Sequence, residues 1–388
     1  MKRNVDVVRA FAAILSVALF SMIFAFLASS CTENSTPEAT PVKKTAKLQL
    51  VVTGTSSAPQ SRSISDALPA KEDNINMLVI GVFNADGSMN SVSEFEPKTS
   101  DEVAEMYCAP GNCDIIVVAN APKGTFESVQ TKAEFLSKTV DLSQTATSNM
   151  QNPNNLPMSG QGTVTLAPNA TTPVTISLTR LVARISIASI KTAFASGSDN
   201  ANATFKLDKV YLCNVLSASK IAPGNVATTF PTNPQWLNVD GVTLGDGVWT
   251  GERFLMNEIT PVVLSGMGAN EYNVPNWFYA FANNDENHRT KLVISGWYDA
   301  DGNSGPAASA YVYYPIVVNQ AQMGTEFSGD AGDRHDGTIS RNRDYRLRAT
   351  IAKKGVDSPD KEISVAELQL TVSVDNWKLE IIQDVTIE

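Results

Sequence analysis

The sequence predicts an all-β protein built from two tandem β-sandwich domains of transthyretin-like or Greek-key type, with few short helices. Apolar residues recur with a period of two rather than 3.6 along most of the chain. The segments that carry this period are rich in Val, Ile, Thr and aromatic residues and are bounded by Gly, Pro, Asn or Asp. With 388 residues, of which 43% are hydrophobic, the chain can bury a substantial core and corresponds to about two domains.

Residues 1–30 are predicted to be a secretory signal peptide. Basic residues precede an apolar run at 10–28, and small residues then lead to Cys31 in the stretch LASSC. Bacterial lipoproteins carry their lipidated cysteine at this place, so Cys31 is predicted to become the lipidated mature N-terminus. The alternatives are a plain signal peptide and a single anchor helix, because about 20 apolar residues can span a bilayer. The segment 31–62 is predicted to hold a tether rich in Thr, Pro, Glu and Lys and then one amphipathic strand.

The body of the chain is predicted to consist of strands. They cover 75–89, 113–122, 162–168, 172–190, 290–302 and 307–318. The best helical pattern, at 128–142, would form an inserted surface helix. In the long strand 172–190, Arg180 and Arg184 flank an apolar trio, and we expect this stretch at the junction between an N-terminal sandwich, 63–182, and a C-terminal sandwich, 183–388.

Charge and cysteine content limit the partners and the compartment. The formal net charge is -10, and a chain of this sign repels phosphate backbones, so nucleic acid is excluded as a partner. Besides Cys31 there are Cys108, Cys113 and Cys213, an odd number. The stretch CAPGNC could form a disulfide between Cys108 and Cys113 in an oxidising envelope, if the geometry allows it.

The sequence offers no motif for catalysis, a cofactor or a metal. Nucleophilic catalysis needs a base held beside its nucleophile, and His288 and His335 both lie in polar turns. The stretch DADGN at 299–303 imitates the start of a calcium loop, but Ser304 and Ala310 occupy the positions of the required Gly and Glu, so a hairpin turn is favoured. The chain is therefore not expected to be an enzyme.

Two segments far apart in the sequence carry the same amphipathic strand. In KLQLVVTG, Leu48, Leu50 and Val52 fall on one face. In ELQLTVSVD, the residues in the corresponding positions are Leu368, Leu370, Val372 and Val374. The two strands could fill the same apolar groove in the same register, although half-buried strands often look alike.

The loop after the first of these strands offers a cleavage site. It is polar, contains Pro and presents Arg62 followed by Ser63 to a trypsin-like protease. A cut after Arg62 would free the strand and leave unpaired backbone groups along a groove, which is a template for a strand of another chain.

These features together resemble the type V pilins, or fimbrillins, of Bacteroidetes. The segments that carry the resemblance are, in order, LASSC, KLQLVVTG, INMLVIGVFNADG, DIIVVANAP, LPMSG, TRLVARISI, RNRDYRLRATI and the closing LQLTVSVDNWKLEIIQDVTIE. The resemblance implies an outer-membrane lipoprotein precursor, removal of the N-terminal strand by an Arg-specific protease after Arg62, and a donor strand within about 366–388. It also implies that Trp377 belongs to the donor segment, either as an anchor in a neighbouring subunit or as part of its own core.

The resemblance implies partners and alternatives as well. The partners would be other copies of the chain, accessory fimbrial subunits, the protease, membrane lipid before cleavage and a host or bacterial surface ligand, and the final location would be a cell-surface fimbrium. A long amphipathic C-terminus favours a shaft subunit over a tip or an uncleaved anchor. The alternative from another class is a surface lipoprotein that binds glycans through exposed aromatic residues, for which the candidates are Trp277, Tyr279, Trp297 and Tyr298.

Overall fold

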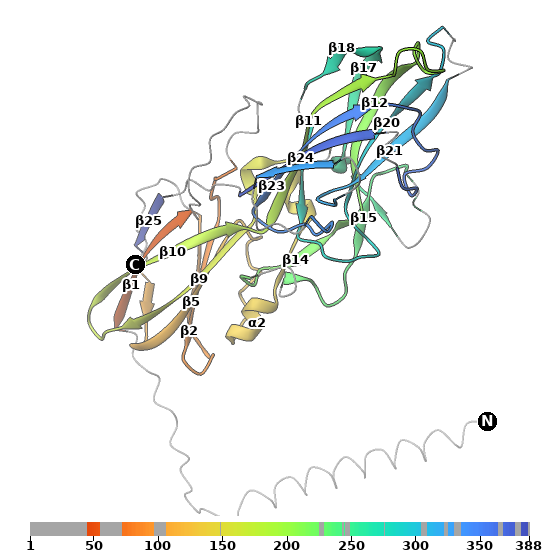
Figure 1. Cartoon of the computed structure of the whole chain (residues 1–388). Coiled ribbons are helices and arrows are strands. Elements are labelled where there is room, and N and C mark those ends of the chain that lie inside the picture. The colour runs from red at the N-terminus through yellow and green to blue at the C-terminus, as the bar shows by residue number, and fades with distance from the viewer. Residues whose placement is uncertain are drawn as a thin grey trace, which may run out of the picture. The chain divides into compact units, whose positions relative to one another are not determined.

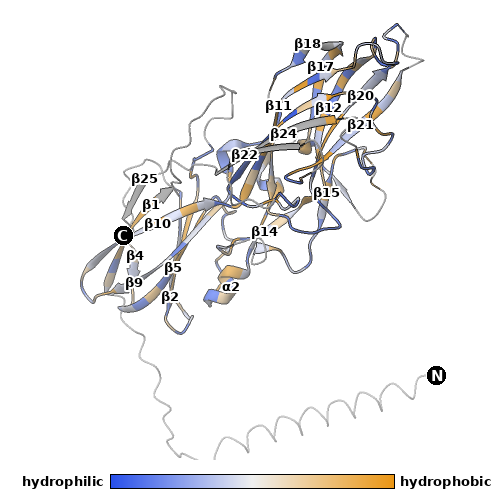
Figure 2. Cartoon of the chain, viewed as in Figure 1, coloured by the Kyte–Doolittle hydropathy of each residue, from blue (hydrophilic) through white to orange (hydrophobic). Residues whose placement is uncertain are grey.

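The structure is a computed structural model. It describes residues 45–54, 72–96, 106–147, 149–224, 229–242, 244, 249–274, 276–303, 309–321, 325–329, 335–363, 368–376 and 382–386. Nearly all regular structure in this part is β, as predicted (Figure 1). Figure 2 shows hydrophobic and hydrophilic residues alternating along many of the strands, which is the period that places one face of each strand against a core.

The N-terminal half is one eight-stranded sheet that curls around its own core. Its order is β25-β1-β10-β9-β5-β2-β3, with β4 also paired to β1. The strands are β1 (Ala46–Gly54), β2 (Leu78–Asn84), β3 (Met89–Phe95), β4 (Met106–Cys108), β5 (Gly111–Ala119), β9 (Met158–Leu166), β10 (Thr171–Arg180) and β25 (Ile382–Thr386). Buried side chains of β1 and β10, towards one end of this order, and of β5 and β2, towards the other, belong to one cluster. We call this cluster the N-terminal core.

The C-terminal half is a sandwich of two larger sheets. One has the order β18-β11-β23-β24-β22, with β19 also paired to β11, and the other the order β17-β12-β20-β21. The first contains β11 (Val182–Ala193), β18 (Met267–Tyr272), β19 (Asn276–Phe281), β22 (Thr325–Gly329), β23 (Arg343–Ile351) and β24 (Leu368–Asn376). The second contains β12 (Thr204–Cys213), β17 (Met256–Ser265), β20 (Lys291–Asp299) and β21 (Ala310–Val317). Inward residues of both sheets share one hydrophobic cluster.

Short elements complete the described part. They are β6 (Thr139–Asp141) with β14 (Ala218–Lys220), β7 (Ala146–Thr147) with β8 (Met150–Gln151), and β13 (Val215–Leu216) with β15 (Trp236–Asn238) and β16 (Thr250–Gly251). The 3₁₀ helices are η1 (Leu142–Thr145), η2 (Pro153–Asn155) and η3 (Arg253–Leu255). Among the described residues, no helix has the length and apolar character needed to cross a membrane.

The helix predicted at 128–142 is shorter than expected. Helix α2 covers only Lys132–Ser137, where the Thr131 side chain caps it by accepting a hydrogen bond from the Glu134 N–H. It ends at Lys138 because the next residues are extended and pair with β14. Phe135 of α2 stacks on Phe126 with ring centroids 4.2 Å apart, so the helix covers the outer apolar face of β2 and β5.

The long strand predicted at 172–190 is divided in two. β10 belongs to the N-terminal sheet and β11 to the C-terminal sandwich, and Leu181 lies between them. The change of sheet therefore occurs at Leu181, between Arg180 and Val182. One strand departs from the expected grouping, because β25 lies near the C-terminus of the chain and returns to the N-terminal sheet.

Candidate functional site

Strand β1 has the two faces that its sequence predicts. The side chains of Leu48, Leu50 and Val52 are fully buried in the N-terminal core. The alternate residues Lys47 and Gln49 are half-buried. The strand thus inserts a row of apolar side chains into the core, and full burial of each stabilises the fold by about 1.5–3 kcal/mol.

Strand β1 is an interior strand with neighbours along both edges. On one side it pairs with β10 in parallel, from Lys47 opposite Thr171 to Gly54 opposite Leu178. On the other side it pairs antiparallel with β4 at its start and with β25 along its second half (Figure 1). The ladder between β1 and β10 is the one parallel pairing among the described strands of this sheet, and parallel pairs are slightly less stable per residue than antiparallel pairs.

Removal of β1 would leave a slot in the sheet rather than trim its edge. Backbone groups of β10 on one side and of β4 and β25 on the other would lose their partners. The core residues Ile115, Val117, Ile176 and Leu178 belong to the same cluster as the β1 side chains and would be uncovered. The slot would therefore accept a strand with apolar residues at alternate positions.

Several predicted site residues lie outside the part of the chain that the structure describes. They are Cys31, Arg62, Ser63 and Trp377. The structure describes the chain as far as Gly54, the end of β1, and again from Glu72, ahead of β2.

The two arginines of the junction hold Glu72 and Asp73. The Arg184 guanidinium donates to Glu72 Oε2 at 2.6 Å, and Tyr279 donates its hydroxyl to Glu72 Oε1 at 2.7 Å. Arg180 forms an ion pair with Asp73 and donates from Nε to the Glu72 carbonyl oxygen at 3.4 Å. Glu72 and Asp73 are thereby fixed where the N-terminal sheet gives way to the C-terminal sandwich.

The same Arg184 also binds the C-terminal sandwich. It donates from Nε to Asp344 Oδ1 at 3.0 Å and from its NH2 group to Oδ2 at 2.6 Å. Arg346 adds a hydrogen bond to Asp344 Oδ2 at 2.7 Å. We call Glu72, Asp73, Arg180, Arg184, Tyr279 and Asp344 the junction cluster. Sequence reasoning identified its two arginines but not its carboxylates, of which Asp344 lies in the RNRDYR segment.

Burial and charge pairing set the ionisation of the junction cluster. Burial lowers the pKa of Arg180 to about 10 in spite of the nearby charge of Asp73. Burial also raises the pKa of Tyr279, and the charge of Glu72 adds to this effect. For Asp344, burial alone would raise the pKa, but the hydrogen bonds and charge of Arg184 outweigh it and lower the pKa below its ordinary value of 3.8. The cluster is therefore a set of mostly buried charges that depend on one another, with Asp73 partly exposed.

The predicted donor residues Leu368, Leu370, Val372 and Val374 lie on β24. This strand does not lie in the N-terminal sheet beside β1. It pairs antiparallel with β23, with Leu368 opposite Ile351, and in parallel with β22. Leu368 is buried in the C-terminal cluster, and the residues of β23 that face the other three positions are buried as well. Within one subunit, β24 therefore completes its own sandwich, and β25 is the C-terminal strand that contacts β1.

The cysteines of CAPGNC are thiols in this structure, and a disulfide between them in an oxidising envelope stays a prediction. Cys108 on β4 and Cys113 on β5 are both buried. The Cys113 thiol donates to the Gly111 carbonyl oxygen at 3.7 Å and accepts from Asn90 Nδ2 at 3.5 Å, and burial raises its pKa. These contacts satisfy the Cys113 sulfur without a covalent bond.

The aromatic residues considered for glycan binding divide into two groups. Tyr279 and Tyr298 are buried and cannot meet a ligand at the surface. Trp297 is 41% exposed, and Trp277 is half-buried and lines a surface pocket. The candidate for glycan contact is therefore one of the two tryptophans.

His288, which was considered for catalysis, contacts an aromatic ring and a carboxylate of its own turn. The ring of His288 stacks on Trp236 with centroids 4.6 Å apart, and its Nδ1 lies 3.3 Å from Asp285 Oδ1. Both contacts hold the turn that carries the histidine. No group of three or more potential metal ligands occurs in the described ranges.

Comparison with known proteins confirms the resemblance to fimbrillins. Residues 46–206 match the family model of the major fimbrial subunit protein, FimA. The structure is similar to a fimbrilin (FimA) of Porphyromonas gingivalis, with a TM-score of 0.67 and 21% identity over 88% of this chain and 99% of that chain. It is also similar to candidate cell adhesion proteins of Parabacteroides distasonis (TM-score 0.63, 20% identity, 86% of this chain and 99% of that one) and Bacteroides eggerthii (0.62, 20%, 87% and 97%).

These matches confirm the β-sandwich fold and support a coarse function. The matched family model is that of a major fimbrial subunit protein, and the match covers residues 46–206 of the 388.

Proposed function

We propose that this chain is a shaft subunit of a fimbrium that polymerises by exchange of a strand. It would be exported as a lipoprotein lipidated on Cys31, held at the outer membrane, and cut after Arg62 by an Arg-specific protease. Strand β1 would then leave, and the C-terminal segment 366–388 of another subunit would take its place. The observation that carries this proposal is the position of β1 between β10 and β4, with its apolar side chains in the core.

The connection of β1 to the rest of the chain suits removal after one cut. Residues 55–71, which include Arg62, link β1 to Glu72 and Asp73. The junction cluster fixes Glu72 and Asp73 on the body side of this link. A cut after Arg62 would therefore separate β1 from a body whose new N-terminal segment stays attached through Arg180 and Arg184.

The exchange would generate a fibre because it joins two different surfaces. One subunit contributes its slot and the next contributes its C-terminal segment, so the contact is heterologous and repeats without closing. Before cleavage, β1 fills the slot and prevents this contact.

The two C-terminal strands would contribute differently. Release of β24 would uncover the buried residues of β23 that it pairs with, such as Leu347 and Ile351. Release of β25 would break its short ladder with β1, from Gln49 opposite Thr386 to Thr53 opposite Ile382. We therefore infer that β25 is the first part of the segment 366–388 to transfer, and that the residues from Leu368 to Val374 transfer only if the neighbour offers a replacement contact.

The proposal is tested by cleavage of the purified precursor. Brief treatment with an Arg-specific protease, which spares Lys71 in the same link, should remove residues up to Arg62, as mass spectrometry would show, and denaturant-resistant polymer ladders should follow. The variant Arg62→Ala should stay intact and monomeric. Deletion of 382–388 and deletion of 366–388 should each abolish the ladders in cleaved protein, because both remove β25.

The other outcomes identify the alternatives. A precursor that resists cleavage at Arg62 would be an anchor that keeps its lipid. A cleaved chain that stays monomeric but caps the polymers of other subunits would be a tip subunit. A cleaved chain that neither polymerises nor joins other subunits would contradict strand exchange, and a surface lipoprotein of another function would then be the better account.

A further inference from the structure

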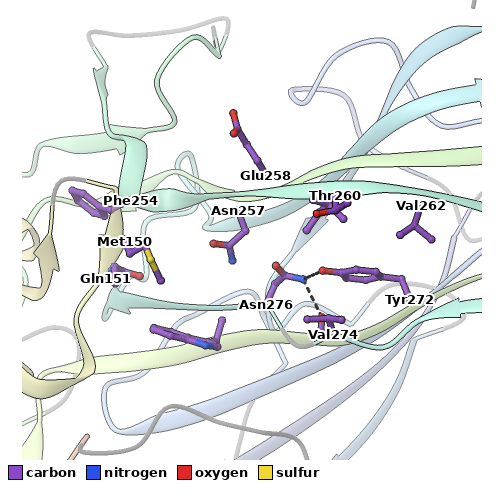
Figure 3. A pocket seen from close by; sticks show the side chains of 12 residues that line it. Met150, Gln151, Phe254, Asn257, Glu258, Thr260, Val262, Tyr272, Val274 and Asn276 are labelled. Atoms are coloured by element: carbon purple, nitrogen blue, oxygen red, sulfur yellow. Dashed lines mark hydrogen bonds between the residues drawn. The ribbon is translucent and has the colours of Figure 1, made fainter.

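A surface pocket of about 510 Å³ opens in the C-terminal sandwich (Figure 3). It lies between β17 and the segment of β18 and β19, which are edge strands of the two facing sheets. Its size falls within the range of about 300–1,000 Å³ that is usual for small-molecule sites. We propose that this pocket binds a neutral sugar ring, such as the terminal unit of a surface glycan.

An aromatic and aliphatic wall forms one part of the pocket. Phe254 and Ile259 line the pocket and are buried, and the half-buried Trp277 lines it as well. The indole of Trp277 packs against the buried ring of Tyr279, with centroids 5.3 Å apart, which holds the indole in position. A fixed aromatic ring at a partly exposed site provides an apolar surface for the C–H face of a sugar.

Amide groups from facing strands supply the polar part of the pocket. Asn276 is 5% exposed, and its Nδ2 donates to the Tyr272 hydroxyl at 3.2 Å and to the Val274 carbonyl at 3.1 Å. These bonds fix the amide and leave Oδ1 as an acceptor. Across the pocket, the half-buried side chain of Asn257 has no hydrogen-bonding partner among the described residues (Figure 3). The Asn257 carboxamide can both donate and accept, the Asn276 Oδ1 can accept, and both match the hydroxyl groups of a sugar.

The charges around the pocket select a neutral ligand. Of the lining residues, Glu258 alone is ionisable as an acid or base in the ordinary range of pH, and its Oε1 accepts from the Arg253 NH2 group at 3.0 Å. No lysine or arginine is among the lining residues, and the whole chain has a net charge of -10. A phosphate, sulfate or carboxylate group on the ligand would therefore meet no cation among the lining residues, and the neighbouring Arg253 is already paired with Glu258.

The backbone of β17 argues against an added peptide strand at this site. The register with β12 shifts between Leu207 opposite Val262 and Lys209 opposite Glu258, so that residues 259–261 bulge out of the ladder. Pro261 in this bulge has no N–H to donate. Bulges and prolines blunt the edge of a sheet against pairing with another strand, and here the bulge instead directs Ile259 and Thr260 to the pocket.

Saturation-transfer NMR on the purified chain tests the proposal with four neutral probes. These are methyl α-D-mannoside, methyl β-D-galactoside, methyl α-L-fucoside and N-acetyl-D-glucosamine, with sialyllactose as an anionic probe. At least one neutral probe should bind with millimolar affinity. Trp277→Ala should weaken that binding about tenfold, since it removes the aromatic contact. Asn257→Ala should weaken the binding of that probe as well. Because Asn257 is polar and only half-buried, this variant removes a ligand contact without disturbing the packing of the core.

The matched control is Trp297→Ala. Trp297 on β20 is 41% exposed and packs on Tyr311 of β21. It is not among the residues that line the pocket. Its removal should leave sugar binding unchanged. The proposal is overturned if no neutral probe binds, if sialyllactose binds more tightly than all of them, or if Trp277→Ala and Asn257→Ala bind as the unchanged chain does. Polymer ladders formed after cleavage should be the same for all these variants, so failure here leaves the proposed assembly untouched.

Discussion

Arg184 and Asp344, which are 160 positions apart in the sequence, form a bidentate ion pair inside the protein. The Arg184 Nε lies 3.0 Å from Oδ1 of Asp344 and the NH2 group 2.6 Å from Oδ2, and each residue is less than 5% exposed. Because Arg184 also binds Glu72, one guanidinium connects the segment ahead of β2 with β23 of the C-terminal sandwich. The stability of the chain should therefore depend on this guanidinium.

Replacement of Arg184 by Ala should destabilise the protein strongly. It would leave the buried carboxylates of Glu72 and Asp344 without their main cation, and loss of one member of a buried pair costs about 3–5 kcal/mol. The control is Lys123→Ala, whose pair with Glu96 is mostly exposed and worth about 0–1 kcal/mol. Urea unfolding measures both. Equal effects of the two changes would contradict a structural role for the junction cluster.

Acid should weaken the junction cluster through Asp344. Its pKa in the folded protein is lower than the ordinary value of 3.8, so its stabilising contribution is fully present above about pH 4 and is lost as the pH falls through the folded value. The free energy of unfolding should therefore fall steeply below pH 4, and Asp344→Asn should reduce that slope. Thermal melts from pH 7 to pH 2 provide the measurement.

The salt dependence of stability distinguishes the buried pair of Asp344 from exposed ion pairs at the surface. Asp357 also has a lowered pKa because Lys361 donates a hydrogen bond to it, but the pair is exposed and is screened by salt. High salt should abolish any difference between Asp357→Asn and the unchanged chain, whereas the effect of Asp344→Asn should persist. A salt-sensitive effect at Asp344 would mean that water reaches the pair.

Removal of β1 should make Cys108 reactive. Cys108 is fully buried on β4, which pairs directly with β1 at Ala46. After cleavage and release of β1 under reducing conditions, and before polymerisation, iodoacetamide should modify Cys108 much faster than in the precursor. Cys213 serves as the internal control, because it is buried in the C-terminal sandwich, away from β1. Peptide mass spectrometry distinguishes the two sites, and unchanged protection of Cys108 would show that β1 stays in place after the cut.

Two glycines on β9 should differ in their tolerance of a side chain. A Cβ at Gly160 would lie 2.3 Å from the Ser177 carbonyl oxygen on β10, whereas a Cβ at Gly162 would meet only the end of the Ile176 side chain. Gly160→Ala should therefore cost about 1–3 kcal/mol or more, and Gly162→Ala should cost less. Urea unfolding of the two variants makes the comparison, and a larger cost at Gly162 would contradict the close approach of β9 to β10.

The amino-acid sequence alone specifies the class of the fold and the local faces of its strands. The alternation of apolar residues in KLQLVVTG specifies which side chains of β1 enter the core, because successive residues of a strand point to opposite faces. The spacing of Arg180 and Arg184 around an apolar trio indicates the junction, since charged residues inside a buried strand need partners. The order of the motifs along the chain resembles that of the fimbrillins.

The choice of partner segments depends on the tertiary structure. The pairing of β1 with β10 in parallel, the place of β24 in its own sandwich and the return of β25 to β1 all join residues far apart in the chain. The same holds for the carboxylates of the junction cluster and for the pocket, whose walls come from η3, β8, β17, β18 and β19. A local pattern sets the period of a strand, but many strands share that period. The choice among them depends on long-range packing and loop closure, which a short stretch of sequence does not specify.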